Sequence, residues 1–232
     1  MSSKLKNEDA IILLSGGQDS VTALHWGLET FRSVSSISFY YKQRHNRELE
    51  AAEYFVTKYN LRHKTIDISF LADLVESDLF QGGGDINAKH KLSNKVPSSF
   101  VPFRNHIFLS LAACYGTTLG VNNIITGVCE TDYSGYADCR DIFIKSLQVA
   151  LNLSMDGSSK GIILHTPLMW LSKAEVFMMA DDYGCLDEIL KNTITCYNGS
   201  TKTNDYGMGC SECSACRLRA KGYKEFREKY GR

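Results

Sequence analysis

A polar stretch near the start of the chain, Ser15-Gly-Gly-Gln-Asp-Ser20, has the composition of a phosphate-binding turn. The apolar run 10–14 before it predicts a short buried strand, and apolar residues at helical spacing follow it. A glycine turn between a strand and a helix directs backbone N–H groups at a ligand, beside the positive end of the helix dipole. The stretch lacks the lysine of the P-loop motif Gly-x-x-x-x-Gly-Lys-Ser/Thr, so it is not a P-loop of that type. It also lacks the spacing of the dinucleotide-binding motif Gly-x-Gly-x-x-Gly.

Four cysteines late in the chain form a second candidate site. Cys210, Cys213 and Cys216 follow one another at intervals of three residues, just after two glycines, and Cys196 lies upstream. Thiolates at such short spacing favour zinc, and four protein ligands leave no open position, so we expect a structural site. An iron–sulfur cluster is the alternative, because closely spaced cysteines also hold clusters.

A third candidate site, residues 128–140, gathers aromatic, acidic and basic side chains in a turn. It follows an apolar run that predicts a buried strand, and open α/β sheets bind ligands at the carboxyl ends of their strands. Tyr133 or Tyr136 could stack on a planar heterocycle, while Asp132 or Asp138 could accept its N–H groups. The alternative is a polar turn that caps the helix expected from about residue 141.

Two cationic side chains stand at predicted helix starts. Arg104 follows Pro102, where a guanidinium could bind a phosphate or a carboxylate. Lys173 lies in the first turn of a predicted helix, where a lysine opposes the helix dipole, and this conflict suggests a role toward a ligand. A solvated arginine and a surface lysine are the alternatives.

Alternating strands and helices must position these residues. The hydrophobic pattern predicts helices over 44–59, 106–119, 142–153 and 172–182, and strands over 10–14, 34–41, 64–68, 122–128 and 162–164. This β-α-β alternation implies a parallel sheet with right-handed crossovers. Residues 80–99 carry three consecutive glycines and little apolar content, so we expect a long loop, either flexible or acting as a lid over a nucleotide.

Composition narrows the class of protein. The 232 residues suit one α/β domain with a small appendage, and 44% apolar and 22% charged residues are ordinary for a globular chain. Lys plus Arg and Asp plus Glu both number 26, which disfavours a nucleic-acid partner. With neither an apolar leader nor roughly twenty consecutive apolar residues, the sequence predicts a cytoplasmic protein without membrane attachment. Eight cysteines in that compartment favour metal binding over disulfides.

Segments spread along the chain together resemble one family. Residues 15–20 are similar to the Ser-Gly-Gly-x-Asp-Ser loop of the adenylating ATP pyrophosphatases, the PP-loop superfamily. The other matching segments are 43–45, 101–102, 104–105, 126–140, 166–170, 173–175, 195–199 and 210–219. In this order they resemble the 7-cyano-7-deazaguanine synthase family of the queuosine precursor pathway.

The resemblance implies a fold and an activity. The fold is a Rossmann-like parallel α/β sheet of the adenine nucleotide alpha-hydrolase type, with a PP-loop ATP-binding domain over 1–190 and a zinc-binding, helical region over 191–232. The activity is that of an ATP-dependent carbon–nitrogen ligase that converts 7-carboxy-7-deazaguanine and ammonia to 7-cyano-7-deazaguanine (preQ0), through an adenylated acid and an amide. The partners are small molecules, without nucleic acid or membrane, and the family is generally homodimeric.

The resemblance also implies site residues. ATP with Mg²⁺ would bind at Leu14, Ser15, Gly16, Gly17, Gln18, Asp19, Ser20, Val21, Thr22, Ala23 and Leu24. One structural zinc ion per chain would bind Cys196, Cys210, Cys213 and Cys216. We hypothesise catalytic roles for Arg104, Asp132 and Lys173. We expect the substrate to contact Arg104, Asn105, Asp132, Tyr133, Asp138 and Arg140.

The sequence departs from the family's pattern at three places. Phe103 stands where glycine is common, and Tyr41-Lys42 stands where Asp-Tyr-Gly is common, so the pocket near ATP could differ in width. Residues 200–206 lengthen the stretch between Cys196 and Cys210, which should leave the zinc site intact because a longer loop closes at little extra entropy. Alternative functions are an enzyme that stops at the amide or modifies a protein amine, a PP-loop enzyme acting on tRNA, and a zinc-knuckle module without catalysis.

Overall fold

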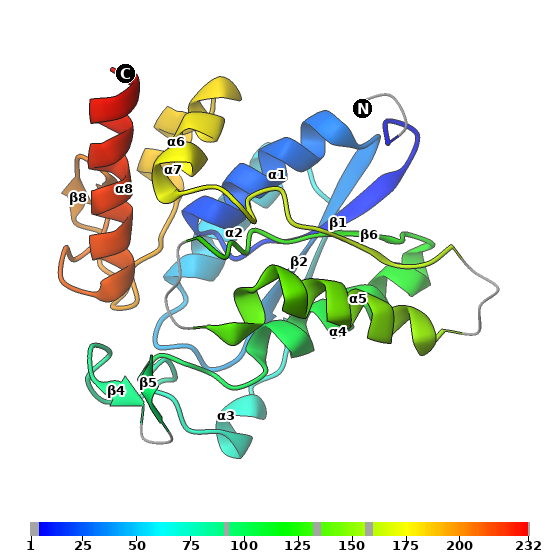
Figure 1. Cartoon of the computed structure of the whole chain (residues 1–232), viewed down its shortest axis with the longest axis horizontal. Helices are drawn as coiled ribbons and strands as arrows, with labels where there is room; N and C mark the ends of the chain where they lie inside the picture. The colour runs from blue at the N-terminus through cyan, green and yellow to red at the C-terminus, as the bar shows by residue number, and fades with distance from the viewer. Residues whose placement is uncertain (1–4, 91–92, 132–135, 156–159, 232) are drawn as a thin grey trace.

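Five parallel strands form the central sheet of the computed structural model, which describes residues 5–90, 93–131, 136–155 and 160–231 (Figure 1). The strands are β1 (Asp9–Leu13), β2 (Ser33–Tyr40), β3 (His63–Asp67), β6 (Asn123–Ile125) and β7 (Ile163–His165). They lie in the order β3-β2-β1-β6-β7, and every neighbouring pair runs parallel. The Rossmann-like α/β sheet predicted from the sequence is therefore confirmed.

The order of the strands reverses between β1 and β6. From β1 the chain adds β2 and β3 on one side of the sheet, and then β6 and β7 on the other. In sheets wound in this way, ligands bind in the crevice at the reversal, outside the carboxyl ends of the strands. The candidate phosphate turn leaves β1 at this crevice, so the topology places it where ligands bind in such sheets.

Helices cover both faces of the sheet. Because side chains alternate along a strand, Ile12 of β1 packs with α1 (Gln18–Thr30), α2 (Arg47–Lys58) and α6 (Lys173–Asp182) in one apolar cluster. Its neighbour Ile11 packs with α4 (Arg104–Leu119) and α5 (Asp141–Leu153) in the other. Three short helical segments complete this part of the chain: α3 (Leu71–Leu74), the 3₁₀ turn η1 (Ala137–Cys139) and α7 (Leu186–Asn192).

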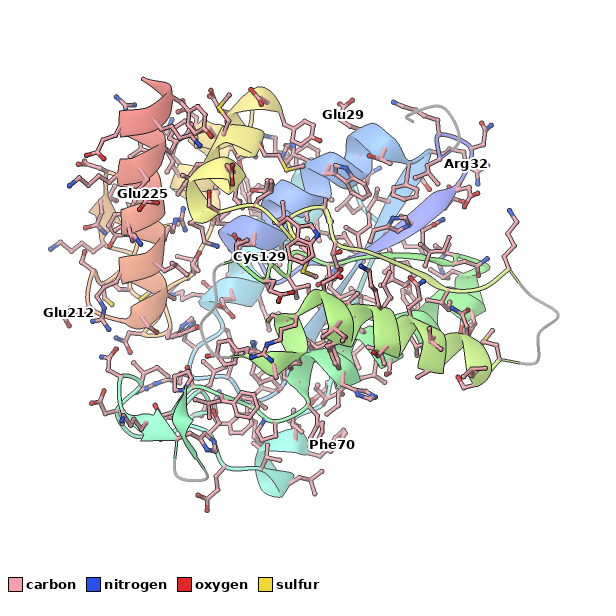
Figure 2. All side chains as sticks on the ribbon, viewed as in Figure 1. Glu29, Arg32, Phe70, Cys129, Glu212 and Glu225 are labelled. Carbon is pink, nitrogen blue, oxygen red and sulfur yellow. The ribbon has the colours of Figure 1, made fainter. Side chains whose placement is uncertain are left out.

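The last helix, α8 (Ser214–Tyr230), lies beside α6 and α7, away from the strands (Figure 1). Phe177 of α6 and Phe226 of α8 are fully buried, with ring centroids 6.0 Å apart. A hairpin of β8 (Thr203–Asn204) and β9 (Gly207–Met208) precedes the helix. The outer face of α8 carries charged side chains such as Glu225 (Figure 2). One face of α8 thus packs on the protein while the other meets solvent.

Residues 80–99 are not the irregular loop that the sequence predicts. Within them, β4 (Lys89–His90) and β5 (Ser93–Pro97) pair as antiparallel strands. Polar contacts order this region: the buried Ser98 donates its N–H to the Ala88 carbonyl oxygen at 3.0 Å and its hydroxyl to the Asp85 carbonyl oxygen at 2.8 Å. Three consecutive glycines and low apolar content predict a loop, and neither feature reveals polar contacts of this kind.

The other predicted strands and helices are confirmed with small shifts of their ends. The strand predicted over 122–128 stops at Ile125, and the chain leaves the sheet so that Thr126, Gly127 and Val128 line a cavity. Within the described ranges, no helix combines the length and the hydropathy needed to cross a bilayer.

Candidate active site and cysteine cluster

The phosphate loop, residues 15–20, is a hydrogen-bonded turn between β1 and α1. Gly17 caps the helix, which begins at Gln18. The Ser20 hydroxyl accepts the Ser15 N–H at 3.2 Å and donates to the Gly17 carbonyl oxygen at 3.0 Å. The first N–H groups of a helix have no acceptor within that helix, so a loop fixed in this way offers them to an anion.

Two glycines let neighbouring segments approach the phosphate loop closely. Gly16 has a φ of +81°, and a Cβ there would lie 2.1 Å from the Glu48 carbonyl oxygen of α2. A Cβ on Gly127, which follows β6, would lie 2.8 Å from the Asp19 carbonyl oxygen. A side chain fits at neither position, so α2 and the segment after β6 form two close walls around the loop.

A cavity of about 230 Å³ opens beside the phosphate loop, at the strand reversal. The predicted site residues that line it are Leu14, Ser15, Asp19, Ser20, Arg104 and Asn105. The cavity is also lined by residues that were not predicted as site residues from the sequence, among them Phe39, Tyr41, Gln43, Glu48, Phe108 and Tyr197. A mainly apolar cavity with a few convergent polar groups is suited to a small-molecule ligand.

Lys173 is not a surface lysine. It is 7% exposed, and its Nζ donates to both carboxylate oxygens of Asp19 at 2.9 Å. The ion pair explains how a lysine is tolerated at the first residue of α6, where the helix dipole disfavours a cation. Gly222 of α8 makes room for its stem, because a Cβ there would lie 2.4 Å from the Lys173 Cγ. Lys173, which the sequence also predicts as a site residue, therefore reaches the phosphate loop although it lies 154 residues after Asp19.

Arg104 begins α4 and faces the cavity. Its guanidinium carbon lies 5.8 Å from the centroid of the Tyr136 ring, in cation–π geometry. Burial acts to lower the pKa of Arg104, but three surrounding tyrosines and the Asp138 carboxylate outweigh it and hold that pKa above its ordinary value. The preceding residue, Phe103, has a φ of +60° and a side chain 71% exposed. This left-handed backbone is what glycine adopts most easily, so a phenylalanine at this position is strained.

Asn105 and Asp138 bind each other. The Asn105 N–H donates to a carboxylate oxygen of Asp138 at 3.0 Å, and the Asn105 side-chain amide donates to the Asp138 carbonyl oxygen at 3.2 Å. The same amide donates to the Cys139 sulfur at 3.3 Å. These bonds fasten η1 to the start of α4, so Asp138 helps to fix the cavity-lining residue Asn105.

The remaining predicted residues lie elsewhere. Val21, Thr22, Ala23 and Leu24 are 0% exposed in the core, so their side chains cannot touch a ligand in the cavity. Gln18 is buried, and its Nε2 has no partner among the described residues. Arg140 caps α5 and is not among the described cavity-lining residues. Asp132 and Tyr133 lie outside the described residues.

Glu48 is the main polar residue of the cavity that sequence reasoning missed. It lies in the first turn of α2, where an acidic residue is ordinary because it complements the helix dipole. Burial raises its pKa to about 7, against the opposing effect of the Arg104 charge. In the sequence, the one feature that points to Glu48 is its position three residues after segment 43–45, which resembles the family.

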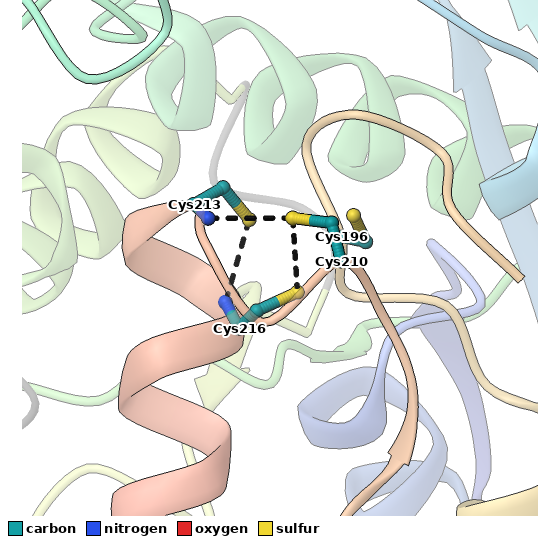
Figure 3. Close-up of side chains that lie close together, drawn as sticks. All are labelled: Cys196, Cys210, Cys213 and Cys216. Atoms are coloured by element: carbon teal, nitrogen blue, oxygen red, sulfur yellow. Dashed lines mark hydrogen bonds between the residues drawn. The ribbon is translucent and has the colours of Figure 1, made fainter. Parts of the chain in front are cut away.

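The four cysteines converge at the amino end of α8 (Figure 3). Their sulfur atoms all lie within 4.8 Å of one another, and those of Cys210 and Cys216 are 3.9 Å apart. Sulfurs placed about 2.3 Å from a tetrahedral zinc ion would be roughly 3.8 Å apart, so the cluster has the size that zinc requires.

The surroundings of the cluster favour thiolates. The N–H groups of Glu212 and Cys213 point at the Cys210 sulfur at 3.4 and 3.3 Å, and the Cys216 N–H points at the Cys213 sulfur at 3.5 Å. A set of four thiolates with supporting N–H donors is the chemistry of a structural metal site.

The cluster also touches the active-site side of the protein. His45 Nε2 donates to the Cys196 carbonyl oxygen at 2.9 Å, and Gly199 lies directly beneath the His45 ring. Two residues before Cys196, the Ile194 N–H donates to the Gly16 carbonyl oxygen at 3.1 Å. The segment 194–196 therefore joins the cysteine cluster to the phosphate loop.

Comparison with known proteins is consistent with this geometry. The family model described as queuosine biosynthesis protein QueC matches residues 9–227. The chain is 46% identical to a 7-cyano-7-deazaguanine synthase of Bacillus subtilis (strain 168), over 96% of each chain. It is also 46% identical to the protein of that name from Clostridium novyi (strain NT), over 97% of this chain and 98% of the relative. A third relative of that name, from Phocaeicola vulgatus, is 45% identical over 97% of this chain.

Proposed function

This chain belongs to the QueC family of queuosine biosynthesis proteins and has that family's 7-cyano-7-deazaguanine synthase activity, an ATP-dependent ligation, and from this premise we propose how its residues act. The cavity binds 7-carboxy-7-deazaguanine with its carboxylate toward the phosphate loop, and ATP binds at that loop. One observation carries the proposal. Asp19 and Ser20 of the loop line the same cavity as Arg104 and a set of aromatic side chains.

The phosphate loop would hold ATP for adenylation. A carboxylate is a poor electrophile, so its oxygen attacks the α-phosphorus of ATP, the bond to the bridging oxygen breaks, and pyrophosphate leaves. The N–H groups at the start of α1 would stabilise the negative charge on the leaving β- and γ-phosphates. Asp19 would provide an oxygen ligand for Mg²⁺, and Lys173 already lies beside it to neutralise phosphate charge.

The wall opposite the loop would hold the substrate. Phe39 and Phe108 are stacked, with ring centroids 4.3 Å apart and an interplanar angle of 12°, and both line the cavity. Their faces can stack on the planar deazaguanine ring. Arg104 would bind the substrate carboxylate and direct it at the α-phosphorus, because a guanidinium matches a carboxylate in two hydrogen bonds.

Ammonia then converts the activated acid in two stages. Its nitrogen attacks the acyl carbon, AMP leaves, and an amide forms. A second ATP adenylates the amide oxygen, and loss of AMP and protons gives the nitrile. Glu48 lines the cavity with a pKa of about 7, so its carboxylate can accept a proton that the nitrogen releases.

The cysteine cluster would hold one zinc ion with a structural role. Its four sulfurs fill a tetrahedral coordination shell and leave no position for substrate. What the ion would supply is a rigid link between Cys196 and the start of α8. Because Ile194 bonds Gly16, that rigidity reaches the phosphate loop.

Product analysis of the complete reaction tests the proposal. Purified protein is incubated with 7-carboxy-7-deazaguanine, ammonium and Mg·ATP, and both the base and the nucleotide products are followed by mass spectrometry. We expect the nitrile, with AMP and pyrophosphate released in equal amounts. An Arg104→Met variant should form much less of either product, whereas Arg227→Met, which changes an exposed arginine of α8, should match the parent.

Other products would contradict particular parts of the proposal. ADP in place of AMP would mean that the loop does not hold a leaving pyrophosphate. Amide without nitrile would favour the enzyme that stops early, for which the exposed left-handed Phe103 beside Arg104 is the relevant departure from the family. In that case Phe103→Gly should restore nitrile formation.

A further inference from the structure

Helix α8 buries an arginine behind the phosphate loop. Arg219 is 1% exposed, and the hydrogen bonds found for it within the described part of the chain all go to uncharged oxygens. Its Nη1 donates to the Thr193 carbonyl oxygen at 3.3 Å and to the Thr195 hydroxyl at 3.1 Å, and its Nη2 donates to the Ile189 carbonyl oxygen at 3.1 Å. Burying a guanidinium against uncharged acceptors costs free energy.

The segment that Arg219 binds forms the back wall of the phosphate loop. Ile194, between the two threonines, donates its N–H to the Gly16 carbonyl oxygen at 3.1 Å. A Cβ on Gly17 would lie 3.6 Å from the Ile194 carbonyl oxygen and 4.0 Å from the Thr195 hydroxyl oxygen. Arg219 therefore fixes the groups on which the loop rests.

The charge of Arg219 also acts toward the loop. Burial lowers its pKa to about 10, while the negative charge of Asp19 acts in the opposite direction. The guanidinium thus remains charged at neutral pH. A cation in the poorly screened interior attracts an anion several ångströms away more strongly than it would in water, and the anion expected at this loop is a chain of phosphates.

A second residue on the same side of α8 serves the same loop. Gly222, three residues after Arg219, leaves the space that the stem of Lys173 occupies, and Lys173 binds Asp19. Glu225 and Arg227 of the same helix are exposed to solvent (Figure 2 shows Glu225). The inner face of α8 therefore reaches the phosphate loop through two independent contacts.

We propose that Arg219 is a positioning residue for the phosphate loop. Arg219 holds residues 193–195 against Gly16 and Gly17, and its buried positive charge favours the binding of pyrophosphate at the loop. The inference rests on the proposed function, since it takes this loop to be the site of the β- and γ-phosphates. Arg219 acts through the segment and through its field, without touching the ligand.

Separate titrations with two fragments of ATP test this role. Isothermal calorimetry measures the affinity for magnesium pyrophosphate and for AMP in the full chain, in Arg219→Met and Arg219→Lys, and in Arg227→Met as the control from the same helix. Thermal melting and metal content are recorded for each protein. Arg219→Met should weaken pyrophosphate binding roughly tenfold and leave AMP binding close to that of the parent, with Arg219→Lys in between and Arg227→Met unchanged.

The outcomes separate this role from a merely structural one. Equal weakening of both ligands, or unchanged pyrophosphate affinity in a folded Arg219 variant, would overturn the proposal. If Arg219→Met does not fold, Arg219→Lys decides by the same comparison, because lysine keeps the charge and loses the forked hydrogen bonds. A parent protein that binds neither pyrophosphate nor ATP would overturn the proposed function of the loop itself, whereas parent-like Arg219 variants would overturn this inference alone.

Discussion

At the scale of single residues, the pair formed by Lys173 and Asp19 shows how the site is held ready for its ligand. Both carboxylate oxygens of Asp19 are occupied by one buried ammonium group. The side chain of Asp19 remains 31% exposed, toward the cavity. A metal ion or a phosphate can therefore reach the pair without any rearrangement of the backbone, and preorganised charge of this kind is effective in catalysis.

Replacing Lys173 by methionine should remove this charge with little change of volume. We expect Lys173→Met to lower kcat by about 10²- to 10³-fold, because the charge that develops on the leaving pyrophosphate loses its nearest cation. Steady-state measurement of pyrophosphate release checks this. The control is Lys191→Met, which changes an exposed lysine of α7 and should retain the rate of the parent. A Lys173→Met enzyme as fast as its parent would exclude a catalytic role.

Glu48 predicts a pH dependence of stability. Its folded-state pKa of about 7 lies above the ordinary 4.5, so the folded protein binds the proton more tightly than the unfolded chain does. Stability from this group is present below about pH 4.5 and is lost as pH rises toward 7. Glu48→Gln should therefore gain stability relative to the parent with rising pH, by about 2 kcal/mol between pH 5 and pH 8. Urea unfolding of both proteins at the two pH values measures the difference, and a constant difference would contradict the assignment.

The residues of this site differ in how far the sequence could predict them. Asp19 and Arg104 belong to local motifs that single them out in the sequence, and both line the cavity. Glu48 lies in the first turn of a helix, where acidic residues are common because they complement the helix dipole. Nothing in the neighbouring sequence therefore distinguishes it from a solvent-facing glutamate. Its raised pKa comes from burial in the cavity, near the opposing charge of Arg104, and this environment exists only once the chain is folded.

At the scale of elements, the junction between the phosphate loop and α2 is the tightest contact of the site. Gly16→Ala would place a methyl group 2.1 Å from a backbone oxygen of α2, at a φ of +81°. Gly184→Ala is a matched control, because its φ is +66° and nothing lies within 4 Å of the added Cβ. We expect Gly184→Ala to cost about 1 kcal/mol of unfolding free energy, and Gly16→Ala at least about 3 kcal/mol. Chemical denaturation gives both values, and equal losses would refute the close packing.

Elements with regular apolar periodicity were predictable, and those built from polar contacts were not. β1, β2 and α4 have buried faces that their sequences display directly. The β4–β5 hairpin has little apolar content. Just after β5, the Ser99 and Tyr136 hydroxyls form a hydrogen bond of 2.6 Å that fastens this region to η1. Such contacts join residues distant in the chain, and no window of sequence contains them.

At the scale of the whole molecule, the cysteine cluster should affect ATP binding although it does not touch ATP. Cys213→Ser, or removal of the metal by a chelator, should lower the melting temperature by about 10 °C or more. ATP affinity should fall with it, because the segment 194–196 would lose its anchor. Calorimetry with ATP, beside metal analysis, measures this. Cys114→Ser, at an exposed cysteine of α4, is the control and should change neither quantity.

The long range of the contacts at the phosphate loop has a consequence for synthesis on the ribosome. The loop occupies residues 15–20, but Lys173, Ile194 and Arg219 complete its surroundings. At roughly 5–20 residues per second, the loop is made many seconds before these supports emerge. A growing chain therefore carries the loop without the groups that would make it bind nucleotide. We therefore expect a chain that ends before α8 to bind nucleotide more weakly than the full chain, because it lacks Arg219 behind the loop.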